Sequence, residues 1–246
     1  MIFAQESPTV YDGLNRKLTE ANVIGAGGLQ VNTYTGNLFL VRSDLYISAG
    51  YGGNNTTRSN VQRNYPLAIT FSYNSGETKY NYGYGAGWTN TFNIVYEKLG
   101  TDICVKRWDG NRDIFVNIIA NVYEPPVGCY DSLTQYASGK FRLRLKHGGE
   151  IFFDDSTHGK ATRIRDRNGN TITISYTGGY PRLITDANNR HLGLKWLGGR
   201  MVQLIDSISS PERTISYQYD SLWNLVSVTE PLGKLVHYGY DYAKGL

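Results

Sequence analysis

The chain has 246 residues, which is long enough for one large β domain or two smaller ones with a substantial core. Its 28 glycines and its 19% of charged residues, below the roughly 25% that is usual, are typical of short strands joined by tight turns. The net charge of +4 is mild, no apolar run approaches the roughly 20 residues of a membrane helix, and no long helical pattern occurs. These features argue against a membrane-spanning segment and against a helical protein.

The first 30 residues are polar, contain several glycines and show little periodicity, so we expect residues 1–30 to form a tail or a loosely docked plug. The start, Met1-Ile-Phe-Ala-Gln5, is too short for a signal peptide but is typical of the end of one. We therefore expect a secreted or cell-surface protein whose mature part begins near Gln5. The alternative is that Met1 is the natural start of a cytoplasmic chain.

Residues 31–158 are predicted to form a β region that precedes a repeat array at residues 159–246. In this region, alternation of apolar residues predicts three strands: Asn37–Ile47, Leu67–Tyr73 and Trp88–Tyr96. Two hairpins are predicted from their turn residues: Asp102–Phe115, turning at Asp109-Gly110, and Phe141–Phe153, turning at Gly148-Gly149.

The only two cysteines, Cys104 and Cys129, lie in this β region and would close a loop of moderate length. In an oxidising compartment a disulfide between them would stabilise the fold by roughly 3 kcal/mol. Two free, buried thiols are the alternative.

A turn signature repeats along the last third of the chain. It consists of Asp166-Arg-Asn-Gly-Asn170, Asp186-Ala-Asn-Asn-Arg190, the longer run from Asp206 through Pro211 to Arg213, and Glu230-Pro-Leu-Gly-Lys234. The acidic residues are 20, 20 and 24 positions apart, a spacing typical of repeat architectures. Gly169 and Gly233 occupy the same place in their turns, so we expect both to be structural turn formers, as are the three aspartates.

Apolar residues flank each turn with a period of two, which predicts strands. Two positions before the acidic residue stand Ile164, Ile184, Leu204 and Val228, and six positions after the turn stand the aromatic residues Tyr176, Trp196, Tyr219 and Tyr240. The intervening residues are mostly polar. Each unit is therefore interpreted as a half-buried hairpin that needs its neighbours, and the sequence predicts an all-β fold of stacked antiparallel hairpins.

These units resemble the RHS or YD-repeat family, whose repeats carry Tyr-Asp followed by Asp-x-x-Gly-Asn/Arg. The resemblance rests on Tyr219-Asp220-Ser-Leu-Trp-Asn-Leu225 with Glu230-Pro-Leu-Gly-Lys234, on Tyr240-Asp241, and upstream on Val31-Asn-Thr-Tyr-Thr-Gly-Asn-Leu38, Pro66-Leu-Ala-Ile-Thr-Phe-Ser-Tyr-Asn74 and Gly85-Ala-Gly-Trp-Thr-Asn-Thr-Phe92. It covers roughly residues 31–246. The chain departs from the pattern where Trp223 and Lys244 replace a consensus glycine.

The resemblance implies a coiled β-sheet that forms a shell wall, as in bacterial RHS proteins, the C component of Tc toxins and teneurins. It implies a non-enzymatic role in enclosing or presenting a polypeptide cargo such as a toxin. The expected partners are the remainder of a longer RHS chain or, through strand-edge pairing, another copy of the chain in a filament. The alternative is an adhesin or glycan-binding module that uses exposed aromatic residues.

The residues give little sign of catalysis, so we expect no enzyme, no cofactor and no metal. The nearest candidate cluster is Asp154-Asp155-Ser-Thr-His158, for which a polar turn is favoured over a metal site. Tyr82-Gly-Tyr-Gly-Ala-Gly-Trp88 lacks the context of a nucleotide-binding loop, and its glycines allow either close packing or an exposed sugar-stacking surface. The alternating Arg163, Arg165 and Arg167 favour a solvated strand face, so no nucleic-acid partner is expected.

Overall fold

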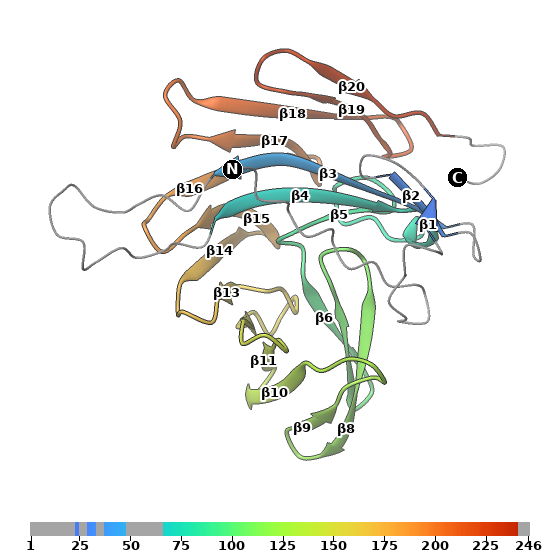
Figure 1. Cartoon of the computed structure of the whole chain (residues 1–246), viewed down its shortest axis with the longest axis vertical. Coiled ribbons are helices and arrows are strands. Elements are labelled where there is room, and N and C mark those ends of the chain that lie inside the picture. The colour runs from blue at the N-terminus through green and yellow to red at the C-terminus, as the bar shows by residue number, and fades with distance from the viewer. Residues whose placement is uncertain (1–22, 25–28, 33–36, 48–65, 241–246) are drawn as a thin grey trace, which may run out of the picture.

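The computed structural model of the chain describes residues 23–24, 29–32, 37–47 and 66–240 (Figure 1). These residues form twenty strands in two antiparallel sheets, with one short 3-10 turn at Ser75–Glu77 and no α-helix. The predicted all-β fold of stacked antiparallel hairpins is confirmed. Most of the predicted N-terminal tail lies outside the described residues.

The smaller sheet has five strands in chain order: β1 (Val23–Ile24), β2 (Leu29–Asn32), β3 (Leu38–Ile47), β4 (Leu67–Asn74) and β5 (Trp88–Asn90). Strands β3 and β4 are long and pair along most of their length. β4 is buried on both faces over Phe71–Tyr73. On one face Phe71 and Tyr73 pack against Tyr217 and Tyr240 of the repeats, and on the other Ser72 donates to the Trp108 carbonyl at 3.1 Å.

The larger sheet has fifteen strands, each paired with its neighbours in the chain. They are β6 (Val95–Leu99), β7 (Asp102–Lys106), β8 (Arg112–Ile119), β9 (Val122–Glu124), β10 (Ser132–Ala137), β11 (Lys140–Arg144), β12 (Glu150–Phe153), β13 (Arg163–Arg165), β14 (Thr171–Thr177), β15 (Tyr180–Thr185), β16 (His191–Leu197), β17 (Arg200–Asp206), β18 (Arg213–Tyr219), β19 (Leu225–Thr229) and β20 (Leu235–His237). This sheet crosses residue 158 without a break, so the repeat strands and the strands from Val95 onward form one structure.

The strand predicted at Trp88–Tyr96 is wrong, because the segment forms two strands in different sheets. A turn separates β5 from β6: the side chain of Asn90 accepts a hydrogen bond from the Phe92 backbone, and the Asn93 amide donates to the Asn90 carbonyl. Asn90 and Asn93 are the residues that favour this local turn over a continuous strand.

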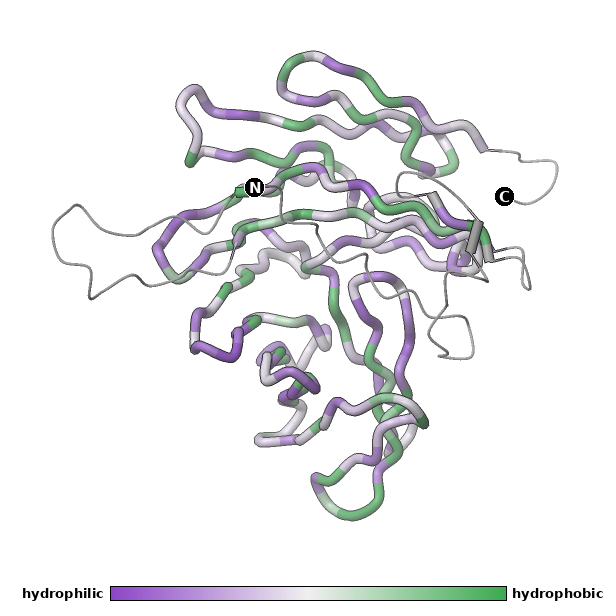
Figure 2. Tube along the Cα trace, viewed as in Figure 1, coloured by the Kyte–Doolittle hydropathy of each residue, from purple (hydrophilic) through white to green (hydrophobic). Residues whose placement is uncertain are grey.

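The large sheet curls so that its beginning contacts its middle (Figure 1). The Tyr96 amide donates to the Gly159 carbonyl at 2.7 Å, and the Ala161 amide donates to the Ile94 carbonyl at 2.9 Å. Beyond this seam, the strands from β14 to β20 lie across β3, β4 and β5 of the small sheet. Apolar and polar residues alternate along these strands (Figure 2), and the apolar set joins the small sheet in one core.

Candidate functional site at the junction of the two sheets

The aspartates of the repeated turns, Asp166, Asp186 and Asp206, hold the backbone of their loops. The Asp166 carboxylate accepts hydrogen bonds from the backbone amides of Asn168 and Asn170 at 2.8 and 2.9 Å. The Asp186 carboxylate accepts the equivalent two bonds, from the amides two and four residues later, both at 2.9 Å. Asp206, in the longer third turn, accepts amides two and three residues later and binds Arg213 at 2.6 Å. One carboxylate therefore satisfies several loop donors in each of the three turns.

In the turns that begin at Asp166, Asp186 and Glu230, the fourth position has a positive φ, which favours glycine. Gly169 has φ +89° and Gly233 has φ +81°, while Asn189 takes the same place with φ +60°. The structure adds a turn of the same kind at the opposite end of the strands. There Asp220 accepts the amide of Asn224 at 2.8 Å, and Trp223 has φ +69° at the place of the consensus glycine.

The four aliphatic repeat residues face the core from alternate strands, β13, β15, β17 and β19. Ile184 pairs with Ile174 and Leu192, and Leu204 pairs with Leu194 and Ile215. Ile164 pairs with Ile172, and Val228 pairs with Tyr217 and Val236, so all four positions share one face of the sheet.

The four aromatic repeat residues bind the backbone of a preceding unit. Each donates its polar hydrogen to a carbonyl 15 to 18 residues earlier: Tyr176 to Ala161 at 2.7 Å, Trp196 to Pro181 at 2.7 Å, Tyr219 to Met201 at 2.8 Å, and Tyr240 to Leu225 at 2.8 Å. We call this series the aromatic ladder. It explains why tyrosine and tryptophan, which carry a donor, occupy these positions in place of aliphatic residues.

Irregular strand pairing creates the acceptors of the aromatic ladder. The register shifts at three of its aromatic residues, where Tyr176 pairs with Pro181, Trp196 with Met201 and Tyr219 with Leu225. The carbonyls of Pro181, Met201 and Leu225 each accept the hydrogen bond from the aromatic residue of the next unit. Because a bulge disrupts the strand ladder, an aromatic donor from the next unit replaces the missing bond and joins successive hairpins.

The Gly-rich loop that precedes β5 inserts against the repeats. The Gly83 carbonyl accepts the Met201 amide at 2.9 Å, and a Cβ at Gly83 would lie 2.5 Å from both the Gly199 carbonyl oxygen and the Trp196 ring. A Cβ at Gly85 would lie 2.9 Å from the Leu225 amide nitrogen. The glycines therefore permit close packing of the loop on the ladder, the first of the two roles considered for them.

Aromatic and charged side chains also attach the small sheet to the repeats. The Trp88 indole donates to the Tyr240 hydroxyl at 2.9 Å, and the Tyr217 hydroxyl donates to Asp44 at 2.5 Å. Asp44 is buried beside Arg42. Burial raises the pKa of Asp44 despite the opposing effects of Arg42 and Tyr217. This pairing keeps an otherwise costly charge satisfied at the interface.

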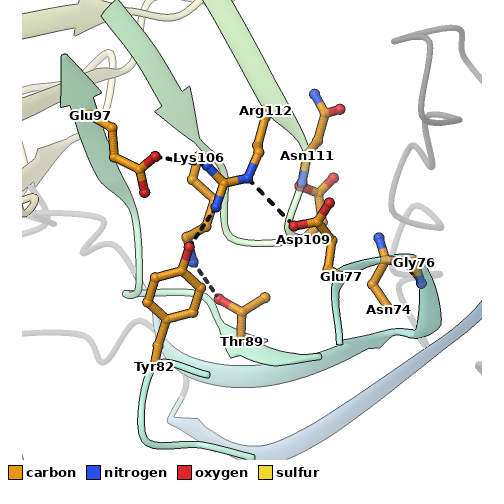
Figure 3. A network of polar contacts seen from close by, with 10 residues as sticks. All are labelled: Asn74, Gly76, Glu77, Tyr82, Thr89, Glu97, Lys106, Asp109, Asn111 and Arg112. Atoms are coloured by element: carbon orange, nitrogen blue, oxygen red, sulfur yellow. Dashed lines mark hydrogen bonds and ion pairs between the residues drawn. The ribbon is translucent and has the colours of Figure 1, made fainter. Parts of the chain in front are cut away.

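A polar network joins β7 and β8 to the loop after β4 (Figure 3). Arg112 of β8 donates to the Tyr82 hydroxyl at 2.8 Å, binds Glu97 at 3.0 Å and Glu77 at 3.4 Å, and lies over the Tyr80 ring at 3.9 Å. The guanidinium thus holds together a strand of the large sheet and two points of the loop that leads into β5.

Lys106 lies at the centre of this network and is only 1% exposed. Its ammonium donates to Thr89 at 2.9 Å and lies 4.0 Å from the centre of the Tyr82 ring (Figure 3). Within the described part of the chain it forms no ion pair. Burial, together with the positive charge of Arg112, lowers the pKa of Lys106 to about 7. Sequence reasoning missed this residue, because Lys106 differs from a surface lysine only through contacts with distant segments.

The disulfide considered between Cys104 and Cys129 is not formed, and both residues are free thiols. Cys104 alternates with Ile103 and Val105, which face the core, so it shares the opposite face of β7 with Lys106. Cys129 packs against the core side and accepts a contact from Arg107 at 3.8 Å.

The acidic and basic candidates near the start of the repeats bind one another. Asp154 binds Arg163 at 2.9 Å, and Asp155 binds His158 at 2.8 Å. Burial opposes ionisation of Asp154, but hydrogen bonds from Arg163, Tyr136 and Thr162 outweigh it and lower the pKa to about 2. Arg165 pairs with Glu150, so two of the three alternating arginines have acidic partners.

No protein-family model matches the chain, and no curated protein matches it. No helix within the described ranges is both long and apolar enough to cross a membrane. The junction is built from packing, hydrogen bonds and ion pairs, and its chemistry is that of an interface that joins two sheets.

Proposed function

We propose that the chain is a non-enzymatic structural protein, a secreted or cell-surface segment of an RHS/YD-repeat β-sheet wall. The observation that carries this proposal is the aromatic ladder, because it links successive hairpins from Ala161 to Tyr240 within one continuous fifteen-strand sheet. A sheet of this kind resists unfolding and proteolysis because its strands have few free edges. The small sheet adds an inner layer that stiffens the repeats.

The wall would extend through strand pairing at its last described strand. Strand β20 pairs with β19 on one side and is the end of the sheet within the described residues. An unpaired edge accepts another strand readily. The proposed partners are therefore the remainder of a longer RHS chain or a second copy of this chain, with a polypeptide such as a toxin as the enclosed or presented cargo.

Aromatic packing favours the wall over an adhesin. A glycan-binding row needs exposed rings, whereas Trp88 and Trp196 are buried and Trp223, although exposed, has the Arg200 guanidinium over its ring at 3.7 Å. The adhesin remains the second candidate because Tyr46, Tyr130 and Tyr136 are exposed.

Limited proteolysis of the purified chain, followed by mass spectrometry, tests the wall. We expect residues 95–240 to persist as one protected fragment at protease levels that degrade a urea-unfolded control. Rapid cleavage in the turns between β14 and β19 would overturn the proposal. Electron microscopy of the same sample then identifies the partner at β20: ordered filaments indicate self-pairing, and separate particles indicate the remainder of a longer chain. Saturable glycan binding that is lost in Tyr130→Ala would favour the adhesin.

A further inference from the structure

A cavity of about 220 Å³ lies at the seam where the Gly-rich loop meets the first repeats. Its wall combines four tyrosines, two asparagines and one lysine with Gly83, Phe92 and Pro181: the tyrosines are Tyr82, Tyr84, Tyr176 and Tyr180, the asparagines are Asn81 and Asn93, and the lysine is Lys160. An apolar cavity of roughly 150 Å³ can hold benzene, so this volume suits a single six-membered ring with substituents. It is smaller than the roughly 300 Å³ at which sites for drug-sized ligands begin.

Lys160 is fixed at this cavity by the backbone seam. It lies between Gly159 and Ala161, whose backbones pair with Tyr96 and Ile94, and Lys160 itself forms a bridge with Val95. A Cβ at residue 159 would lie 2.3 Å from the Tyr96 carbonyl oxygen, so only glycine fits at the position before the lysine. The fold therefore restricts the backbone of Lys160, from which the ammonium group extends.

The charge of Lys160 has no acidic partner within the described ranges. Its ammonium donates to the Gly179 carbonyl and lies 5.6 and 6.0 Å from the ring centres of Tyr176 and Tyr180. The nearest acidic influence, Asp155, is already bound to His158. A half-buried cation that is bonded to a carbonyl and forms no ion pair within the described ranges is suited to an incoming carboxylate.

The rest of the wall suits a ring that carries hydroxyl groups. Tyrosine faces stack on the apolar face of a sugar ring, while asparagine amides both donate and accept hydrogen bonds. The Asn93 amide donates a hydrogen bond to the Thr89 hydroxyl at 3.0 Å, and the same hydroxyl accepts a hydrogen bond from Lys106. This part of the cavity wall is therefore positioned before a ligand enters.

We propose that this cavity binds one acidic sugar residue, with the carboxylate of a uronic acid on Lys160 and its ring against Tyr176 and Tyr180. The proposal does not depend on the wall function, because a structural wall can carry a saccharide site. It also differs from the adhesin alternative, which uses exposed aromatic residues such as Tyr46 and Tyr130 that do not line this cavity.

Calorimetric titration with methyl β-D-glucuronide tests the proposal, with methyl β-D-glucoside as the neutral probe. We expect the acid to bind at least about tenfold more tightly than the neutral sugar, the factor that one charge-assisted hydrogen bond supplies. Lys160→Met should remove this preference, whereas Lys195→Met, which changes an exposed lysine on β16, should keep it.

Because Lys160 also binds Gly179, Tyr180→Ala provides a second variant that leaves the seam intact. Tyr180→Ala should weaken binding of both sugars by a similar factor, since it removes one ring from the lining of the cavity and keeps the charge of Lys160. Near-ultraviolet circular dichroism checks that each variant is folded. Equal affinity for the two sugars, the absence of binding to the acid, or unchanged binding in both Lys160→Met and Tyr180→Ala would overturn the proposal.

Discussion

Tyr219→Phe removes only the hydroxyl group of Tyr219 and so tests how much one hydrogen bond of the aromatic ladder stabilises the fold. The Tyr219 hydroxyl donates to the Met201 carbonyl at 2.8 Å and lies 3.5 Å from the Gly83 carbonyl, so it links a repeat strand and the Gly-rich loop. Met201 is fully buried, and without the hydroxyl its carbonyl loses this donor. Leaving a buried acceptor unsatisfied costs about 1–3 kcal/mol, whereas Tyr219→Ala, which also removes the ring, should cost roughly 3–5 kcal/mol.

Urea unfolding followed by tryptophan fluorescence measures both effects. With a slope of about 2–3 kcal/mol per molar urea, the phenylalanine variant should lower the midpoint by roughly 0.3–1.5 M. Tyr130→Phe is the matched control, because the Tyr130 side chain is 72% exposed and its substitution should change stability by less than about 0.5 kcal/mol. If Tyr219→Phe is as stable as Tyr130→Phe, the hydroxyl does not join the repeats and the reasoning is refuted.

Three further predictions follow from the junction. Gly83→Ala should lower the melting temperature more than Gly169→Ala. Both residues have φ near +90°, but only a Cβ at Gly83 would meet other atoms within 4 Å. Equal losses would mean that backbone strain alone destabilises both variants. Because burial lowers the pKa of Lys106 to about 7, the unfolded chain binds more protons between about pH 7 and its ordinary value of 10.5, so stability should rise with pH from 7 to 9. Lys106→Met should remove most of this rise in urea titrations, and an unchanged slope would contradict it. Cys104 and Cys129 should both react with a thiol reagent in denaturant without prior reduction, and fewer than two equivalents would reveal a disulfide.

The repeat strands were predictable because their signals are local. Period-two apolar residues and the Asp-x-x-Gly and Asp-x-x-Asn turns are properties of neighbouring residues, and β14 to β19 form where the pattern places them. The segment from Tyr219 to Leu225 was matched to the repeat family but not predicted as one of the repeated turns, because Trp223 occupies the place of the consensus glycine. Asp220 and Asn224 nevertheless have the spacing of Asp166 and Asn170. That spacing is the signal that could have identified it.

The junction itself could not be predicted from local patterns. Lys106 and Thr89 are on different sheets, and Tyr219 meets Gly83 across 136 positions of the chain. Pairs at such distances in the sequence leave no periodic signal in a single chain. The break between β5 and β6 was similarly obscured, because Phe92, Ile94 and Tyr96 continue the alternation that begins at Trp88, while the Asn90 side chain forms the turn.

Hydrogen–deuterium exchange read by mass spectrometry tests most directly whether the repeats and the small sheet form one wall. We predict that peptides covering the Gly-rich loop, residues 81–88, are protected together with β14 to β19 and lose protection with them as urea is added, because the loop is bonded to the ladder. Full exchange of the loop within seconds, while β14 to β19 remain protected, would contradict the account.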